Sequence, residues 1–485
     1  MEKNVIWVLL IFIATTRTFG QEQQEVLIDT SILIEDYNYL LTTLDETHPN
    51  LYAYIPKDEF VSKTDEFRKS IYKPMSRTEF YKIVLKTIAL IKQGHTMVFD
   101  DCGFGKYTDE GGLRFPFEIY YEDGHIYVDK NFSSIKELSK GTEIIAINRI
   151  PVSKITERFR PYLRVRPNGF IGGTLAYNWP SYLWMEYGFG EEFVLSYILQ
   201  GENKIKTTTV AGITVETIAE RGKEPDELEF NFTIEKDKGI AIITLNTFVW
   251  EFDEYDSLLN NSFTKIKEHG INNLIIDLRE NGGGNGSLAN SLMNYLTDKT
   301  FISQSMSQVK TSEATKKCYT THPIFVNAIE QARKAEGNSS EFLELVDCFL
   351  EKPAGTITKF EKSEIKPTKK ENRFEGQLYL LTSNNTFSAA TYFTSLIKDN
   401  NLGYIVGEET SDNPSDYGCF MWFELPNTKI NIQNSTRYDV RPGGFDDKHG
   451  VIPDFQITQT YRDYLTGYDR VMNYTFWLIE EGITN

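Results

Sequence analysis

The sequence predicts an α/β domain over residues 233–485, preceded by a helical domain over 21–105 and a β-rich domain over 106–232. Three patterns support this division. Apolar residues recur at helical spacing in the first part. Short alternating stretches separated by turn residues fill the second. Apolar strands alternate with helices in the third. A length of 485 residues agrees with about three domains.

Composition and charge narrow the class of protein. Apolar residues make up 40% and charged residues 25%, which is ordinary for a globular chain. The formal net charge of −18, with no basic stripe to offset it, argues against a nucleic-acid partner. Such a charge mainly favours solubility.

The first twenty residues have the pattern of a secretory signal peptide. Lys3 supplies a positive charge, Val5–Ala14 is apolar, and Thr18-Phe19-Gly20 offers small residues for cleavage. An apolar run of about ten is too short to cross a bilayer, which needs about twenty. We find no other segment able to span, so we expect no integral span after the signal is removed. The mature chain is expected to begin near Gln21 and to be periplasmic or secreted.

Four cysteines are too few for a disulfide scaffold. Cys318 and Cys348 flank a helical stretch and could pair, and Cys102 and Cys419 are further candidates. The spacing leaves all three connectivities open. Neither the cysteines nor the six histidines have metal-binding spacing, so we expect no metal site.

Helix signals define the N-terminal domain. Ile32–Glu46 is helical and stops before Pro49, and Pro56 opens a second helix. Ser76 and Glu79 form a capping box for a third helix, which we expect Gly94 to follow as the C′ residue.

Strand signals dominate the middle of the chain, at Phe117–Tyr121, His125–Val128, Phe193–Ile198 and Lys206–Val210. In the α/β domain, residues 310–370 are charged and partly helical, and they interrupt the alternation of strands and helices. We expect a surface insertion there, for which a lid is one possible role.

A glycine loop follows the apolar strand at Leu274–Leu278. Its sequence, Arg279-Glu280-Asn281-Gly282-Gly283-Gly284, precedes a helix, so its main-chain N–H groups can converge on a negative oxygen. A Walker A loop is excluded because the loop has no lysine. Gly284–Ala289 also fits the dinucleotide pattern GxGxxA, and a plain turn is a further alternative.

A second strand, Gln377–Thr382, leads through a polar turn to Ser388 at the start of a helix. Ser388 is therefore expected at the edge of the sheet where the parallel strands have their carboxyl ends, which is where ligands bind in open α/β sheets. Serine is also a favoured helix N-cap, and this structural role is the alternative to a catalytic one.

An ordered set of segments resembles the C-terminal-processing (tail-specific) and tricorn-like serine peptidases. The matching segments run through nearly the whole mature chain: Asp45–Pro49, Gly94–Thr96, Gly141–Asn148 with Pro151-Val152, Asp277–Gly284, Thr386–Ala390, Gly407–Thr410, Leu425–Asn427 and His449–Asp454. The resemblance implies a crotonase-like (ClpP-like) catalytic domain behind a helical domain and a PDZ-like domain. It also implies that Ser388 is the nucleophile and that the N–H groups of Gly283 and Ala389 form the oxyanion hole.

The resemblance selects the branch with a catalytic triad. The Ser–Lys branch carries a lysine shortly after the Gly-Glu-x-Thr segment, whereas Thr410 is followed here by Ser411-Asp412-Asn413. His95 matches the histidine of the triad branch, and Asp447, with Asp446 beside it, occupies the slot of the acidic residue. A solvated charged turn is the alternative for these two aspartates.

The sequence therefore predicts an exported serine endopeptidase that acts on peptides or unfolded protein tails and needs no cofactor. The alternative is a non-catalytic ligand- or peptide-binding protein on the same fold, because a retinoid-binding protein also resembles this family. Sequence alone does not determine the oligomeric state.

Overall fold

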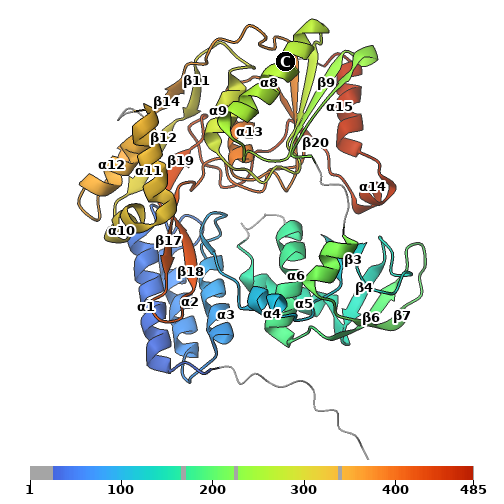
Figure 1. Ribbon diagram of the computed structural model, residues 1–485, viewed down its shortest axis with the longest axis vertical. Helices are drawn as coiled ribbons and strands as arrows, with labels where there is room; N and C mark the ends of the chain where they lie inside the picture. Colours follow the sequence, from blue (N-terminus) through green and yellow to red (C-terminus); the bar gives the residue numbers. More distant parts are fainter. Residues whose placement is uncertain (1–25, 165–170, 223–227, 337–340, 484–485) are drawn as a thin grey trace, which may run out of the picture.

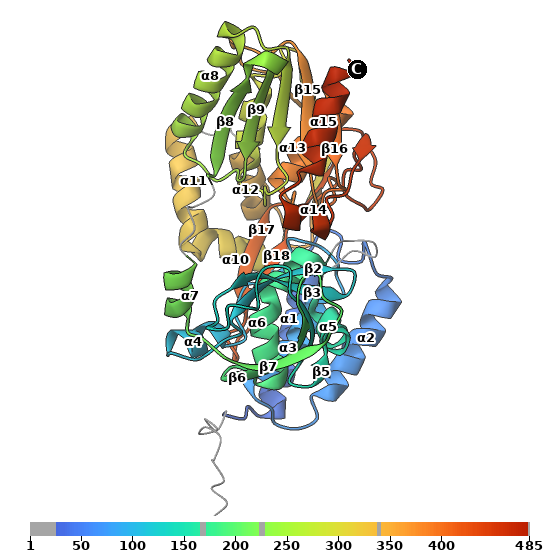
Figure 2. The same cartoon turned by 90° about the vertical axis from the view of Figure 1, so that its right-hand side faces the viewer.

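The computed structural model describes residues 26–164, 171–222, 228–336 and 341–483, and Figures 1 and 2 show it in two perpendicular views. The signal peptide predicted over residues 1–20 lies outside the described residues. Within them, no helix combines the length and the apolar character needed to cross a bilayer.

The N-terminal part is a layer of helices. Its elements are α1 (Thr30–Thr47), α2 (Lys57–Ser70), α3 (Arg77–Ala89), β1 (Met97–Val98) and α4 (Phe104–Asp109). The capping box of Ser76 and Glu79 is present at the start of α3. The prediction that Gly94 is the C′ residue is wrong, because α3 ends at Ala89. Gly94 instead passes the Phe387 ring so closely that a Cβ would come within 2.5 Å of it.

The middle of the chain folds around an antiparallel sheet in the order β2-β3-β4-β6-β7, with β5 paired to β4. The predicted strands in this region are confirmed. The elements are β2 (Phe117–Glu122), β3 (His125–Asn131), β4 (Glu143–Ile147), β5 (Ile150–Pro151), α5 (Val152–Phe159), η1 (Arg160–Tyr162), α6 (Gly172–Tyr187), β6 (Glu192–Ile198), β7 (Lys206–Ala211) and α7 (Val215–Arg221).

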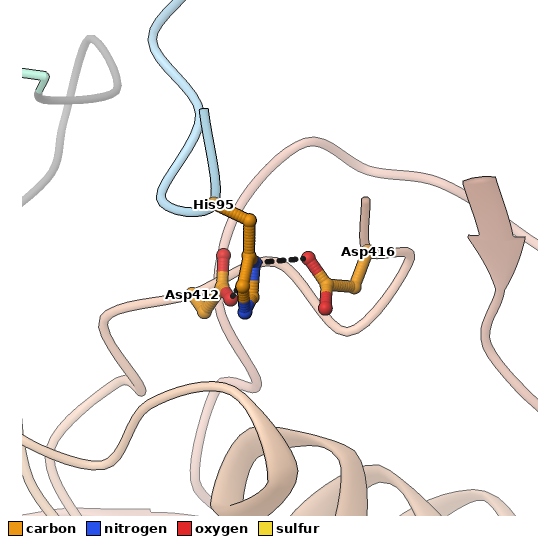
Figure 3. A group of neighbouring side chains, drawn as sticks. All are labelled: His95, Asp412 and Asp416. Carbon is orange, nitrogen blue, oxygen red and sulfur yellow. Dashed lines mark ion pairs between the residues drawn. The ribbon is translucent and has the colours of Figure 1, made fainter. Parts of the chain in front are cut away.

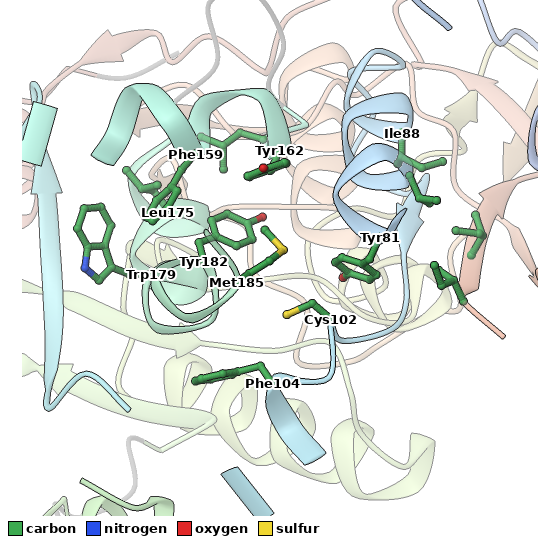
Figure 4. Close-up of a cluster of buried hydrophobic side chains, with 14 of the residues drawn as sticks. Tyr81, Ile88, Cys102, Phe104, Phe159, Tyr162, Leu175, Trp179, Tyr182 and Met185 are labelled. Carbon is green, nitrogen blue, oxygen red and sulfur yellow. The ribbon is translucent and has the colours of Figure 1, made fainter. Parts of the chain in front are cut away.

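The helical and β-rich parts share a hydrophobic core. Tyr81 and Ile88 of α3 belong to one buried cluster with Tyr162, Tyr182 and Met185 (Figure 4). Burial of such aromatic side chains is strongly stabilising. The shared core therefore holds η1 against α3 and places the residues after η1 near the loop between α3 and β1.

The C-terminal part contains the α/β sheet, ordered β20-β16-β15-β10-β9-β8. All neighbours are parallel except β8 and β9. Helices α8, α9 and α13 cover one face of the sheet and α15 covers the other (Figure 1). Their buried side chains belong to the two clusters that flank the sheet. The elements are β8 (Phe230–Glu235), η2 (Lys236–Lys238), β9 (Ile240–Leu245), α8 (Phe252–Glu268), β10 (Asn273–Asp277), α9 (Gly286–Met293), β15 (Gln377–Thr382), α13 (Ala389–Asp399), β16 (Tyr404–Gly407), β20 (Phe455–Gln456), α14 (Tyr461–Thr466) and α15 (Arg470–Glu480).

The remaining elements connect the α/β sheet to the helical layer, as Figure 1 shows for β17 and β18. They form the sheets β1-β18-β17, β11-β14 and β13-β12-β19. These elements are β11 (Phe301–Gln304), β12 (Met306–Lys310), α10 (Glu313–Thr321), α11 (Pro323–Glu336), α12 (Glu341–Glu351), β13 (Ile357–Phe360), β14 (Ser363–Ile365), β17 (Phe420–Glu424), β18 (Asn431–Ser435) and β19 (Arg437–Val440).

The segment predicted as a surface insertion, residues 310–370, is built into this connection. Tyr319, Val346 and Phe349 are buried in the same core as α1 and α3. The segment thus packs against the helical layer. All four cysteines are free, so none of the pairings considered from the sequence forms.

Candidate active site

The glycine loop and the serine turn lie side by side because β10 and β15 are parallel neighbours. Asp277 at the end of β10 is in register with Leu381 near the end of β15. The Phe387 N–H donates to Asn281 O at 3.0 Å, and the Thr386 hydroxyl donates to Leu278 O at 2.9 Å. These bonds fix the serine turn against the glycine loop.

Ser388 precedes the first residue of α13 but does not cap the helix. Its backbone has φ 51° and ψ −120°, and its side chain makes no capping hydrogen bond. A non-glycine residue in this region of φ/ψ space is strained, and such strain is found mostly at functional sites. The structural alternative, a serine N-cap, is therefore not what the geometry shows.

His95 lies in the loop between α3 and β1, and side chains from other parts of the molecule hold this loop. The Gln433 amide donates to His95 O at 3.0 Å. Arg164, just after η1, donates to Gly94 O and, at 3.3 Å, to Thr96 O. The imidazole stacks on the Phe387 ring with a centroid distance of 5.1 Å. Main chain and ring are both fixed, so the direction of the ring nitrogens is set.

The structure brings Ser388 and His95 together. The Ser388 Oγ lies 2.9 Å from His95 Nε2, although the two residues are 293 positions apart in the chain. This is within the 2.6–3.2 Å that a general base needs to take a proton.

Two carboxylates lie near Nδ1, the other nitrogen of the His95 ring (Figure 3). His95 Nδ1 lies 3.2 Å from Asp416 Oδ1 and 3.6 Å from Asp412 Oδ2. Both aspartates come from the loop between β16 and β17, which is tied to the serine turn by the Ser411 N–H donating to Thr386 O at 3.0 Å. Serine, histidine and two acidic groups therefore form one continuous cluster.

The charges in this cluster favour a protonated imidazole. Burial of the His95 ring favours its neutral form, but Asp416 and then Asp412 outweigh this effect and raise the pKa of His95 from 6.5 to about 9. Arg164 opposes the two aspartates. His95 is only 7% exposed, so water screens these interactions weakly.

Asp447 does not reach His95, and this corrects the sequence prediction. Its carboxylate lies 2.9 Å from His449 Nε2 and 3.9 Å from Arg441. Asp446 accepts from the Asn413 amide at 2.8 Å and from the Tyr438 hydroxyl at 2.9 Å. Both follow Gly443-Gly444, and the turn directs them to these partners while Asp416 and Asp412 occupy the space beside His95.

The proposed oxyanion hole is also changed in part. The Gly283 N–H donates to the Asn281 side chain at 2.8 Å, which directs it into its own loop. A side chain at position 283 is excluded on steric grounds. The φ of Gly283 is +101°, and a Cβ would come within 2.7 Å of Ser388 Cβ and 3.0 Å of Ala389 N. The Ala389 N–H, at the start of α13, has no hydrogen-bond acceptor among the described residues.

His95, Asp412 and Asp416 are also a group whose donor atoms lie close enough to share a metal ion, all within 4.8 Å of one another. We interpret the group as a charge cluster, in which the His95 Nδ1 side pairs with the carboxylates and Nε2 contacts Ser388.

The sequence pattern of peptidase family S41 matches residues 239–457. The chain carries a peptidase family S41 domain. This part of the molecule is therefore a serine peptidase domain, and it holds the serine turn, the glycine loop and both aspartates. His95 lies outside the matched range. A comparison with curated proteins finds no match.

Crystal structures of mature CPAF share the fold of this chain. The crystal structure of mature CPAF matches with a TM-score of 0.68 and 15% identity, over 94% of this chain and 99% of that one. Mature CPAF complexed with lactacystin matches with a TM-score of 0.67 and 15% identity, over 93% and 99%. The photosystem II D1 C-terminal processing protease matches with a TM-score of 0.43 and 13% identity, over 89% and 93%.

Sequence reasoning missed Asp412 and Asp416. Both lie within six residues after Gly407–Thr410, where the sequence has no lysine. The available signal was two acidic residues in the loop that follows one of the matched motifs.

Proposed function

We propose that the chain is an exported serine endopeptidase that hydrolyses peptide bonds in peptides or unfolded protein tails through an acyl-enzyme. The observation that carries this proposal is the 2.9 Å separation of Ser388 Oγ and His95 Nε2. A carrier has no need for a strained serine beside an imidazole that is itself paired with two carboxylates. Export rests on the sequence of residues 1–20 alone.

The proposed mechanism assigns a role to each group. His95 Nε2 takes the hydroxyl proton as Ser388 Oγ forms a bond to the scissile carbonyl carbon. The carbonyl oxygen becomes an anion, to which the Ala389 N–H donates. The carbon–nitrogen bond then breaks, and His95 returns its proton to the leaving amine. Water, activated by the same imidazole, hydrolyses the ester and frees Ser388.

Asp416, assisted by Asp412, orients the imidazole and stabilises its charged form in this mechanism. The two carboxylates thereby take the place that Asp447 was predicted to fill. Because they also raise the pKa of His95 to about 9, the base form is scarce at neutral pH. We therefore expect alkaline conditions to favour activity.

An active-site fluorophosphonate probe tests the proposal. Wild-type protein should be labelled at Ser388, and mass spectrometry should show one adduct. Ser388→Ala should lose labelling, and His95→Ala should be labelled far more slowly while it remains folded by circular dichroism. Unlabelled wild type that also fails to cleave denatured casein over pH 6 to 10 would favour a binding protein instead.

A further inference from the structure

A cavity of about 310 Å³ lies beside the Ser388–His95 pair, near the lower end of the roughly 300–1,000 Å³ seen for ligand pockets. Its wall includes residues on both sides of His95 in the chain, among them Lys92, Gln93 and Met97. Phe387, Asp412 and Asp416 also line it, as do Asn384 and Asn385 of the serine turn, whereas Ser388, His95 and the glycines at 282–284 do not. The cavity is therefore on the histidine side of the nucleophile.

The histidine side receives the leaving group. In the mechanism proposed above, His95 gives its proton to the amine that departs, so the chain that follows the scissile bond must run past the imidazole. A cavity of this size at that place can take one side chain, or a short chain end.

Gln93 lines this wall, and the nitrogen of its amide is a buried hydrogen-bond donor without an acceptor among the described residues. The Asn50 N–H donates to His48 Nδ1 at 3.0 Å, so the neutral His48 ring carries its proton on Nε2. That proton is donated to Gln93 Oε1 at 2.6 Å. The contact fixes the orientation of the Gln93 amide, and its Nε2 is left with no acceptor among the described residues, although Gln93 is only 5% exposed.

The neutral state of His48 follows from its position. The ring is 1% exposed, and burial lowers the pKa of His48 to about 3. A buried donor without a partner is costly, and native proteins rarely leave one unless a ligand or an ordered water completes the bond. The amide of Gln93 therefore points to an acceptor group as the missing partner.

The cations of the wall indicate the charge of that acceptor. Lys92 is half-buried and makes no ion pair within the described part of the chain. Arg164 also lines the cavity, with its guanidinium on the carbonyls that flank His95. The opposing carboxylates, Asp412 and Asp416, lie against the imidazole, and protonated His95 offsets one of their two negative charges. A carboxylate is the acceptor that satisfies both the Lys92 ammonium and the Gln93 amide.

We propose that this cavity is the subsite for the first residue after the scissile bond, and that Lys92 and Gln93 select a carboxylate there. The carboxylate is supplied by an aspartate or glutamate side chain, or by the free end of a short tail. This inference rests on the proposed peptidase function and names its substrate class.

The test uses the full mature chain and a peptide library. Cleavage sites are first mapped by mass spectrometry on a library made from a digested proteome, and acidic residues should be enriched directly after the cut. Internally quenched peptides with Glu, Gln or Lys at that position then give kcat/KM, each with a C-terminal acid or amide. We expect Glu to exceed Gln by about tenfold, the gain of roughly one charged hydrogen bond. If kcat/KM is raised only in the peptides that have a free C-terminal acid, the chain end supplies the carboxylate that the subsite binds.

Substitutions test whether Lys92 and Gln93 cause the preference for an acidic residue after the scissile bond. In Lys92→Met the ratio of Glu to Gln should fall close to one. Gln93→Glu keeps the oxygen that accepts from His48 but replaces the donor by a second oxygen, so it should turn the preference toward Lys. Lys106→Met removes an exposed lysine of α4 and should keep the wild-type ratio.

The outcomes separate this inference from the proposed function. If peptides are cleaved with no acidic preference, or Lys92→Met keeps the ratio, the subsite assignment is wrong and the peptidase stands. If nothing is cleaved and Ser388 is not labelled, the peptidase proposal fails. In that case fluorescent peptides with N-terminal Glu or Gln, titrated against Ser388→Ala, decide the subsite: equal affinities overturn it, and tighter binding of Glu supports it.

Discussion

The pairing of His95 with two carboxylates predicts an unusual pH dependence, which Asp416→Asn should change in a defined way. In wild type the catalytic base is neutral His95, and its pKa is raised to about 9. kcat/KM should therefore rise about tenfold per pH unit up to that region and level off above it. At pH 7 roughly one molecule in a hundred should carry the base form.

The magnitude follows from the raised pKa. An increase from 6.5 to about 9 corresponds to about 3 kcal/mol of preference for the imidazolium. Asp416 is the largest of the groups that raise the pKa, ahead of Asp412. Asn removes its charge at nearly constant shape, so we expect the rising limb to move to lower pH by about one unit or more.

The same substitution should lower the plateau. In serine peptidases with a single triad aspartate, replacement by asparagine costs about 10⁴-fold in kcat. Asp412 remains 3.6 Å from His95 Nδ1 in Asp416→Asn, so we expect a smaller loss, of order 100-fold. The double variant Asp412→Asn/Asp416→Asn should approach 10⁴-fold.

The assay is steady-state cleavage of one quenched peptide from pH 5.5 to 10.5 at constant ionic strength. Asp447→Asn is the matched control, since it removes the same charge from the pair with His449 and should change neither limb nor plateau. The reasoning is refuted if Asp416→Asn keeps the wild-type limb and plateau, or if Asp447→Asn alters them as strongly.

Three further outcomes are expected. The pKa of His95 is raised from the ordinary 6.5 to about 9 in the folded chain. The stabilisation of the fold by protonated His95 is therefore complete below pH 6.5 and is lost as the pH rises through about 9. In urea unfolding, the free energy of unfolding of wild type should fall by up to about 3 kcal/mol relative to that of His95→Asn over this interval. Gly283→Ala should reduce the rate of fluorophosphonate labelling more than 100-fold, because the new Cβ would come within 2.7 Å of Ser388 Cβ. Differential scanning calorimetry should show that the positive φ at this position costs about 1–3 kcal/mol of folding stability. An unchanged labelling rate would contradict the role of Gly283. Arg164→Met should lower kcat by roughly tenfold or more with KM little changed, because the loop that carries His95 loses its two carbonyl contacts; an effect on KM alone would argue against a positioning role.

The linear order of the chain was enough to predict the strands and turns that carry the nucleophile. Gln377–Thr382 and the turn to Ser388 are local features, because an apolar run, a polar turn and a helix stripe are each written in adjacent residues. The ordered motifs added His95, although it lies 293 positions from Ser388 and no periodicity connects them.

The acidic partners of His95 could not be chosen in the same way. Asp412, Asp416, Asp446 and Asp447 all stand in polar loops and look alike in sequence. Which of them meets the imidazole depends on how the loop after β16 is tied to the serine turn and on where Gly443-Gly444 sends the chain. A sequence motif identifies a residue by its position along the chain, whereas contact with His95 depends on where folding places that residue in space.

By itself, the sequence determined the kind of chemistry: a serine at a sheet edge, a glycine loop beside it and a histidine in a family motif. Only the tertiary structure decided the partners, by turning the Gly283 N–H into its own loop, pairing Asp447 with His449 and placing Asp416 at His95. The physical reason is that local patterns specify backbone conformation over a few residues, while hydrogen bonds between distant loops are selected by packing of the whole core.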